Sequence, residues 1–293
     1  AMYVLMNPGD NFVASRNLYG GSITQFSHAF KKFGWNVNFV DPHDPENFRN
    51  AIDADTKAIF IEVLANPGGI ILDLEPIAAI ANEAGIPLIV DNTMATPYLC
   101  RPFEWGADLI THSMTKFLGG HGTSMGGIVV ESGKFDWAQN DKFPSMTEPD
   151  PAYHGLTFYE TFGDFGFSTK AKAVALRDLG PTLAPQNAFN IITGIESLPV
   201  RMDRHLQNAQ AVAEFLEGHP AVAWVSYAGL KSSPYNALAK KYLPKGPGSV
   251  FTFGVKGGYE AGVKVVESVE LLSHLANLGD TRSLIIHPAS TTH

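Results

Sequence analysis

The residues Ser113-Met114-Thr115-Lys116, with Phe117-Leu118-Gly119-Gly120-His121-Gly122 directly behind them, are the most informative part of this chain. They follow an apolar run that ends in a carboxylate, Pro87-Leu88-Ile89-Val90-Asp91. A lysine set between hydroxyls and glycines, downstream of such an aspartate, is a combination of residue types that supports covalent chemistry on the lysine amine.

These residue types match the needs of pyridoxal phosphate (PLP). A lysine amine such as that of Lys116 forms a Schiff base with the cofactor aldehyde. A carboxylate such as that of Asp91 keeps the pyridine nitrogen protonated, so that the ring acts as an electron sink. The hydroxyls of Ser113 and Thr115 can bind the phosphate, and glycines let the backbone pass close to a bulky ring. The sequence therefore predicts a PLP site.

Strand and helix signals alternate over the first two-thirds of the chain. We expect helices around residues 22–33 and 74–81, and strands over residues 12–15, 35–40, 58–63, 87–91, 108–111 and 127–130. Strands separated by helix-length segments indicate βαβ units, an α/β fold and a mostly parallel sheet. Ligands of such sheets bind beyond the carboxyl ends of the strands, where Asp91 and the Lys116 loop both fall.

The alternation stops further along the chain. Residues 136–164 are rich in Pro, Asp, Gly and aromatics, which predicts a long ordered excursion. Apolar residues at helical spacing then indicate a helix over 198–216 and another marked by Val265, Val269 and Leu272. Between them, residues 249–255 are typical of a strand. We place a domain boundary near Gly194-Ile195, which predicts a large domain over 1–195 and a smaller α+β domain over 196–293.

Composition limits the function classes. The chain has 293 residues, 45% of them hydrophobic and 17% charged, which fits a globular protein with a large core. A net charge of −8 argues against nucleic acid as a partner. The single cysteine, Cys100, excludes an internal disulfide, fits a reducing compartment, and is expected to be inert packing. No apolar run approaches the roughly 20 residues that span a bilayer.

Each motif also has a simpler structural explanation. Asp91 alone is typical of a helix N-cap, and Glu62 and the Asn66-Pro67-Gly68-Gly69 run are typical of a turn. Tyr19 fits an ordinary half-buried aromatic. Because all of them follow apolar strands in this order, we favour the functional interpretation.

A metal site is not indicated. His112, His121 and His287 are scattered, without the short spacing of zinc ligands. The chain also lacks both GxxxxGK[ST] and GxGxxG, so the glycines after Lys116 are not a nucleotide phosphate loop.

The motifs resemble those of the Cys/Met-metabolism PLP enzymes, which have fold type I and include cystathionine synthases and lyases, methionine γ-lyase and O-acetylhomoserine sulfhydrylase. The resemblance covers the whole chain and rests on residues 17–21, 62–67, 91–93, 97–99, 113–122 and 287–293. Residues 93–98, 119–122, 144–150 and 278–284 look most like the O-acetylhomoserine sulfhydrylases.

The resemblance implies three catalytic residues. Lys116 would carry PLP and shuttle protons among Cα, C4′ and Cβ, and Asp91 would pair with the pyridinium nitrogen. Tyr19 would stack on the cofactor ring and assist proton transfer.

The resemblance also implies binding roles. Ser113 and Thr115 would bind the cofactor phosphate. Asn66 would lie near the cofactor O3′ and the substrate carboxylate, and Ser283 near that carboxylate too.

The implied reaction is γ-replacement: O-acetylhomoserine and sulfide or methanethiol give homocysteine or methionine and acetate. Loss of the Cα and Cβ protons lets acetate leave from Cγ, and the sulfur nucleophile adds to the vinylic intermediate. γ-Elimination, as in methionine γ-lyase or the cystathionine γ-synthases and lyases, stays open. A catalytically inactive binding scaffold is a third alternative, against which the presence of Asp91 and Lys116 argues.

The resemblance predicts a cytoplasmic homo-oligomer, a dimer of dimers. Members of the family carry a phosphate-cradling glycine turn and a Tyr-x-Arg segment upstream of the residues matched here, the latter serving the neighbouring subunit. Their substrate-carboxylate arginine lies downstream of His293. We therefore expect this sequence to be a middle section of a longer active unit, and we do not assign the carboxylate role to Arg282.

Overall fold

A six-stranded sheet forms the centre of the molecule. The computed structural model describes residues 1–65 and 69–291. The strands are ordered β2-β1-β3-β6-β7-β8 and comprise β1 (Asn11–Ser15), β2 (Asn36–Val40), β3 (Thr56–Glu62), β6 (Leu88–Asp91), β7 (Leu109–Ser113) and β8 (Gly127–Glu131). The first five run parallel, and β8 runs antiparallel to β7. The predicted α/β fold with a mostly parallel sheet is confirmed.

Apolar periodicity explains how helices cover this sheet. α4 (Leu74–Glu83) buries Leu74, Ile77 and Ala81, which share one face because they are three or four positions apart. Residues 20–33 are helical, beginning with α2 (Gly20–Thr24). The other elements of this part are short: α1 (Met2–Leu5), α3 (Glu46–Ala51), β4 (Leu64–Ala65), β5 (Ile70–Ile71) and α5 (Thr96–Leu99).

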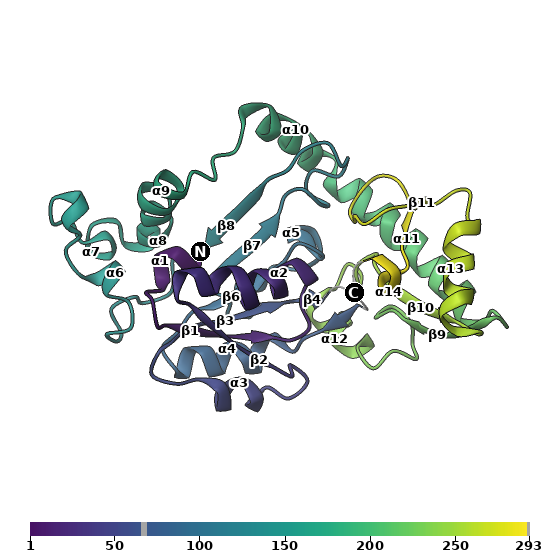
Figure 1. The fold of residues 1–293 in the computed structure, drawn as a ribbon, viewed down its shortest axis with the longest axis horizontal. Helices are drawn as coiled ribbons and strands as arrows, with labels where there is room; N and C mark the ends of the chain where they lie inside the picture. The colour runs from purple at the N-terminus through teal and green to yellow at the C-terminus, as the bar shows by residue number, and fades with distance from the viewer. Residues whose placement is uncertain (66–68, 292–293) are drawn as a thin grey trace.

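The predicted excursion is ordered and forms its own corner of the molecule, at the left of Figure 1. Residues 136–164 contain α6 (Pro144–Thr147) and α7 (Phe158–Phe162), and α8 (Gly166–Lys170) and α9 (Arg177–Leu179) come after them in the chain. Trp137 stacks on Phe167 with ring centroids 5.6 Å apart. The ammonium of Lys170 pairs with Asp150 at 3.1 Å and lies over the Phe158 ring. Aromatic packing and a buried ion pair therefore hold this segment together.

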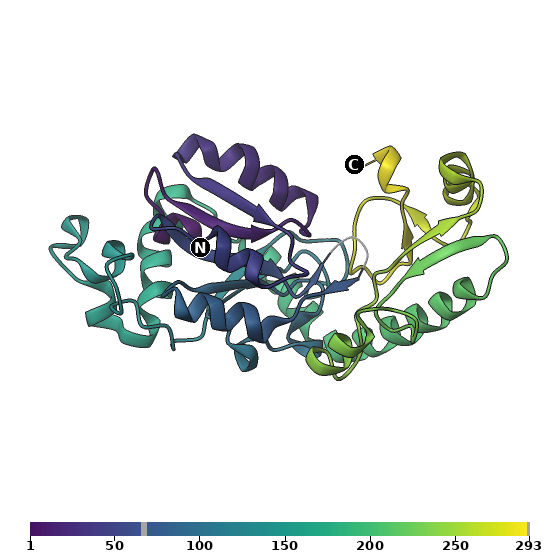
Figure 2. The same cartoon turned by 90° about the horizontal axis from the view of Figure 1, so that it is seen from below.

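Most of the C-terminal elements lie at the opposite end, in green and yellow in both views (Figures 1 and 2), and α10 lies at the top of Figure 1. They are α10 (Pro185–Glu196), α11 (Leu198–Glu217), β9 (Val222–Ser226), α12 (Asn236–Tyr242), β10 (Thr252–Val255), α13 (Gly258–Ser268), β11 (Ser273–His274), β12 (Leu284–Ile285) and α14 (Pro288–Thr291). The expected boundary near residue 195 falls inside α10, and the division into two domains stays a prediction. Among the described residues, no helix is both long and apolar enough to cross a membrane.

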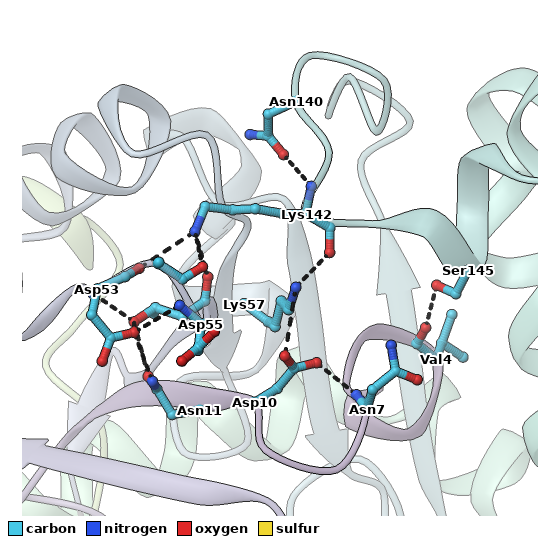
Figure 3. A network of polar contacts seen from close by, with 12 residues as sticks. Val4, Asn7, Asp10, Asn11, Asp53, Asp55, Lys57, Asn140, Lys142 and Ser145 are labelled. Atoms are coloured by element: carbon cyan, nitrogen blue, oxygen red, sulfur yellow. Dashed lines mark hydrogen bonds and ion pairs between the residues drawn. The ribbon is translucent and has the colours of Figure 1, made fainter.

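Two lysines fasten the excursion to the amino ends of the strands (Figure 3). The amine of Lys142 donates to the carbonyls of Ala54, at 2.8 Å, and Thr56, at 3.2 Å. The amine of Lys57, on β3, donates to the carbonyl of Lys142 at 2.8 Å and pairs with Asp10 at 3.6 Å. This edge is thus occupied by structural contacts, and the carboxyl edge carries the predicted functional residues.

Candidate active site

The carboxyl ends of four neighbouring strands bring the predicted residues to one edge of the sheet. Tyr19 follows β1, Glu62 ends β3, Asp91 ends β6, and Ser113 ends β7 with Lys116 in the turn behind it. Glu62 and Asp91 are aligned in the β3–β6 register. Parallel strands place their carboxyl ends together, which is why residues from distant parts of the chain meet here.

Asp91 is desolvated and held by neutral donors. Its Oδ1 accepts the Thr93 backbone N–H at 2.9 Å, and its Oδ2 accepts the Thr111 hydroxyl at 3.2 Å. Burial raises the pKa of Asp91, and the bonds from Thr93 and Thr111 oppose that rise. A cation beside the carboxylate would stabilise its ionised form. The pyridinium nitrogen of PLP is such a cation, so this residue fits the cofactor.

Lys116 sits in a tight turn with its amine partly withdrawn from water. Its backbone N–H donates to the Ser113 carbonyl at 3.2 Å, and its carbonyl accepts the Gly120 N–H at 2.8 Å. The side-chain Nζ donates to Oδ1 of Asn277 at 2.6 Å. Burial lowers the pKa of Lys116. A lowered pKa increases the share of neutral amine, which is the nucleophilic form that attacks an aldehyde.

Threonine side chains tie the ends of β6 and β7 together. The Ser113 backbone N–H donates to Oγ1 of Thr93 at 2.8 Å. The Thr115 hydroxyl donates to the Gly126 carbonyl at 3.3 Å and accepts the Gly126 N–H at 3.1 Å. Thr115 therefore anchors the loop that leads into β8. The phosphate-binding roles of Ser113 and Thr115 stay predictions.

Tyr19 presents its ring from a turn that a buried glutamate holds. The Tyr19 backbone N–H donates to Oε1 of Glu62 at 2.7 Å, and Glu62 is only 4% exposed. The tyrosine itself is 53% exposed. A Cβ at Gly21 would lie 2.4 Å from the Tyr19 ring, so a glycine is needed for the ring to lie where it does. Stacking of Tyr19 on a cofactor stays a prediction.

The two predicted substrate-binding residues are less well defined. Ser283 is exposed just before β12, and its carbonyl accepts the Ser273 N–H at 2.9 Å. Asn66 lies outside the described residues. Both assignments stay predictions.

The histidine and cysteine environments among the described residues are as follows. Across residues 1–65 and 69–291 there is no group of His, Cys, Asp or Glu side chains suited to a metal. Burial lowers the pKa of His112 to about 4, so this side chain is neutral at pH 7. Cys100 is buried, and burial raises the pKa of its thiol to about 12. Such a thiol is unreactive, as expected for packing.

Arg201, on α11, contacts the Lys116 turn although no motif in the sequence marks it. Its guanidinium donates to the carbonyls of Phe117, at 2.8 Å, and Gly194, at 2.7 Å. A Cβ on Gly120 would lie 2.4 Å from the Arg201 Cζ, so this glycine lets the guanidinium approach the turn. Arg201 is a polar residue three positions after Leu198, beside the apolar face of the helix. That position is the only signal the sequence offers for a contact so remote along the chain.

Comparison with known proteins agrees with this geometry. A family model described as Cys/Met metabolism PLP-dependent enzyme matches residues 1–293. The chain is 49% identical over 302 residues to an O-acetyl-L-homoserine sulfhydrylase of Leptospira meyeri, covering 100% of this chain and 68% of the relative. It is 47% identical over 295 residues to a homocysteine synthase of Schizosaccharomyces pombe, covering 100% of this chain and 69% of the relative.

Solved structures give the same result. A structure from Campylobacter jejuni, a putative O-acetylhomoserine (thiol)-lyase with a pyridoxyl-lysine phosphate, superposes with a TM-score of 0.96 at 42% identity, covering 99% of this chain and 69% of that one. An O-acetylhomoserine sulfhydrylase of Wolinella succinogenes gives a TM-score of 0.85 at 34% identity, covering 97% and 78%.

Proposed function

Because the chain belongs to the family of Cys/Met metabolism PLP-dependent enzymes, we propose that it catalyses γ-replacement on O-acetylhomoserine. Sulfide or methanethiol takes the place of acetate at Cγ, giving homocysteine or methionine. The observation that carries the proposal is that Asp91 ends β6 while the turn that carries the partly buried Lys116 follows the adjacent strand β7, so both lie at the same edge of the sheet. The names of the relatives in Leptospira meyeri and Schizosaccharomyces pombe support the choice of substrate.

Four described side chains would hold PLP. The Lys116 amine would bind its aldehyde, the Asp91 carboxylate its ring nitrogen, and the hydroxyls of Ser113 and Thr115 its phosphate. Bound PLP supplies an electron sink for the negative charge that develops when the substrate Cα loses its proton.

The chain itself provides the groups that move protons and bind substrate. A neutral Lys116 amine would accept the proton lost from Cα, the ammonium so formed would give a proton up again, and the neutral amine would then accept one from Cβ, as general acid–base catalysis requires. Tyr19, which is exposed at the same carboxyl edge of the sheet, would cover one face of the bound cofactor ring. Asn66 and Ser283 would hold the substrate carboxylate.

γ-Elimination on the same site is the alternative, since the side chains described above serve both outcomes. We expect purified protein supplied with PLP, O-acetylhomoserine and sulfide to form homocysteine and acetate in equal amounts. Methionine, cystathionine and O-acetylserine should react at least about tenfold more slowly, which is about 1.4 kcal/mol of discrimination. Faster release of a 2-oxo acid and ammonia from methionine would instead identify a lyase. No turnover of any of the four by the full gene product would leave a binding scaffold.

We further propose that the protein acts as a homo-oligomer, a dimer of dimers, in the cytoplasm. Apolar side chains stand exposed on α10, where Phe189 is 67% and Ile192 is 60% exposed, and on β8, where Ile128 is 43% exposed. Exposed apolar side chains of this size mark interaction surfaces when they are contiguous. A lone buried cysteine suits a reducing compartment. Sedimentation should give a dimer or tetramer, and a fully active monomer would contradict the assembly.

A further inference from the structure

A short C-terminal segment, residues 277–281, is docked on the turn that carries Lys116. The Thr281 N–H donates to the Gly120 carbonyl at 3.0 Å. Gly279 has φ +75°, and a Cβ there would lie 2.4 Å from the Phe117 nitrogen. Only glycine allows so close an approach of the two backbones. The segment and the turn therefore fit together as one unit.

Asn277 is the residue of this segment that reaches the lysine amine. Nζ of Lys116 donates to Oδ1 of Asn277 at 2.6 Å, across 161 positions of sequence. Both side chains are partly buried. The lysine side chain is a flexible four-carbon stem, so an amine without a fixed acceptor would sample many rotamers.

We propose that Asn277 is a positioning residue for Lys116, whose amide oxygen fixes the direction of the amine while leaving it free to lose its proton. The inference rests on the proposed role of Lys116 in binding the cofactor. An amide is a neutral acceptor, so it orients the amine without the strong preference for the ammonium that a carboxylate at the same place would create. A lysine with a lowered pKa is thereby held ready to react.

Other charged or titratable groups pack on the same turn and would stay unchanged in a test. Arg201 donates to the Phe117 carbonyl from α11. The His205 ring lies edge-on to Phe117, with centroids 5.7 Å apart. Asp280, on the docked segment, places its carboxylate beside Gly122. They give a constant background against which the side chain at position 277 can be varied.

The test measures the pKa of the Lys116 amine in the full chain freed of cofactor. Trace acetylation with acetic anhydride over a range of pH, with the Lys116 peptide quantified by mass spectrometry, gives this pKa directly. Asn277→Asp should raise it by about one unit or more, because a carboxylate stabilises the ammonium. Asn277→Leu, of similar size, should lower it, because the ammonium loses its acceptor. Asn208→Asp and Asn208→Leu, on an exposed position of α11, are the matched controls and should leave it unchanged.

Shifts of opposite sign support the proposal, because a residue that only stabilises the fold cannot move the pKa in both directions. Unchanged profiles, or shifts of the same sign in both variants, would overturn it. If Asn277→Leu fails to fold, Asn277→Ala takes its place: a lowered pKa in that variant beside a raised one in Asn277→Asp supports the proposal, and a pKa that does not fall refutes it. The measurement uses neither substrate nor PLP. Failure of the sulfhydrylase assay would therefore leave this result standing, and the reverse holds too.

Discussion

Replacing Lys116 with alanine is expected to reduce kcat for homocysteine formation by about 10⁴-fold or more. The variant loses the amine that binds the cofactor aldehyde and the group that moves protons at the substrate, and a single general acid–base group already contributes up to about 10⁴-fold. Once unbound PLP has been removed by gel filtration, the visible absorption of the protein should be lost with the activity. Steady-state kinetics and an absorption spectrum of the same sample give both results.

Lys134→Ala is the matched control for this variant. Lys134 is exposed, and β8 separates it from the Lys116 turn along the chain. Its removal should leave turnover and colour intact. A coloured and active Lys116→Ala protein would show that another amine carries the cofactor.

Asp91→Asn is expected to separate cofactor attachment from catalysis. An amide cannot hold the pyridinium proton by charge, and an opposite charge at this range shifts a pKa by about 1–3 units. The protonated ring becomes about 10- to 1000-fold rarer, and kcat should fall by a similar factor while Lys116 still binds PLP. Asp55→Asn, an exposed carboxylate at the opposite edge of the sheet, is the control and should behave as the parent. Near-parental turnover in Asp91→Asn would mean that another acid serves the ring nitrogen.

Much of the fold could be predicted from local sequence, and the predictions that were wrong failed for physical reasons. The run before Asp91 and the run before Glu62 form β6 and β3 because continuous apolar residues suit strands buried on both faces. Strand direction is not encoded in such a run, so the antiparallel course of β8 came only from the structure. The helix expected to reach Leu272 ends at Ser268, where Val269 turns extended. Valine is β-branched and accepts that conformation easily.

Some residues of the candidate site could likewise be predicted from the sequence, and others could not. Asp91 and Lys116 could be predicted because each follows its own strand, and parallel strands bring their carboxyl ends together. Asn277 and Arg201 reach the turn from elements far along the chain, and no local pattern marks a contact made only by tertiary packing. Asn66 lies outside the described residues, so the structure does not bear on its role.

The most direct measurement is the location of the cofactor on the polypeptide. The protein is loaded with PLP, reduced with borohydride and digested, and its peptides are mapped by mass spectrometry. The peptide that contains Lys116 should gain the pyridoxyl phosphate mass, and Lys116→Ala should lose that label. A label found instead on Lys134 or Lys170, with an unmodified Lys116 peptide, would contradict the central assignment.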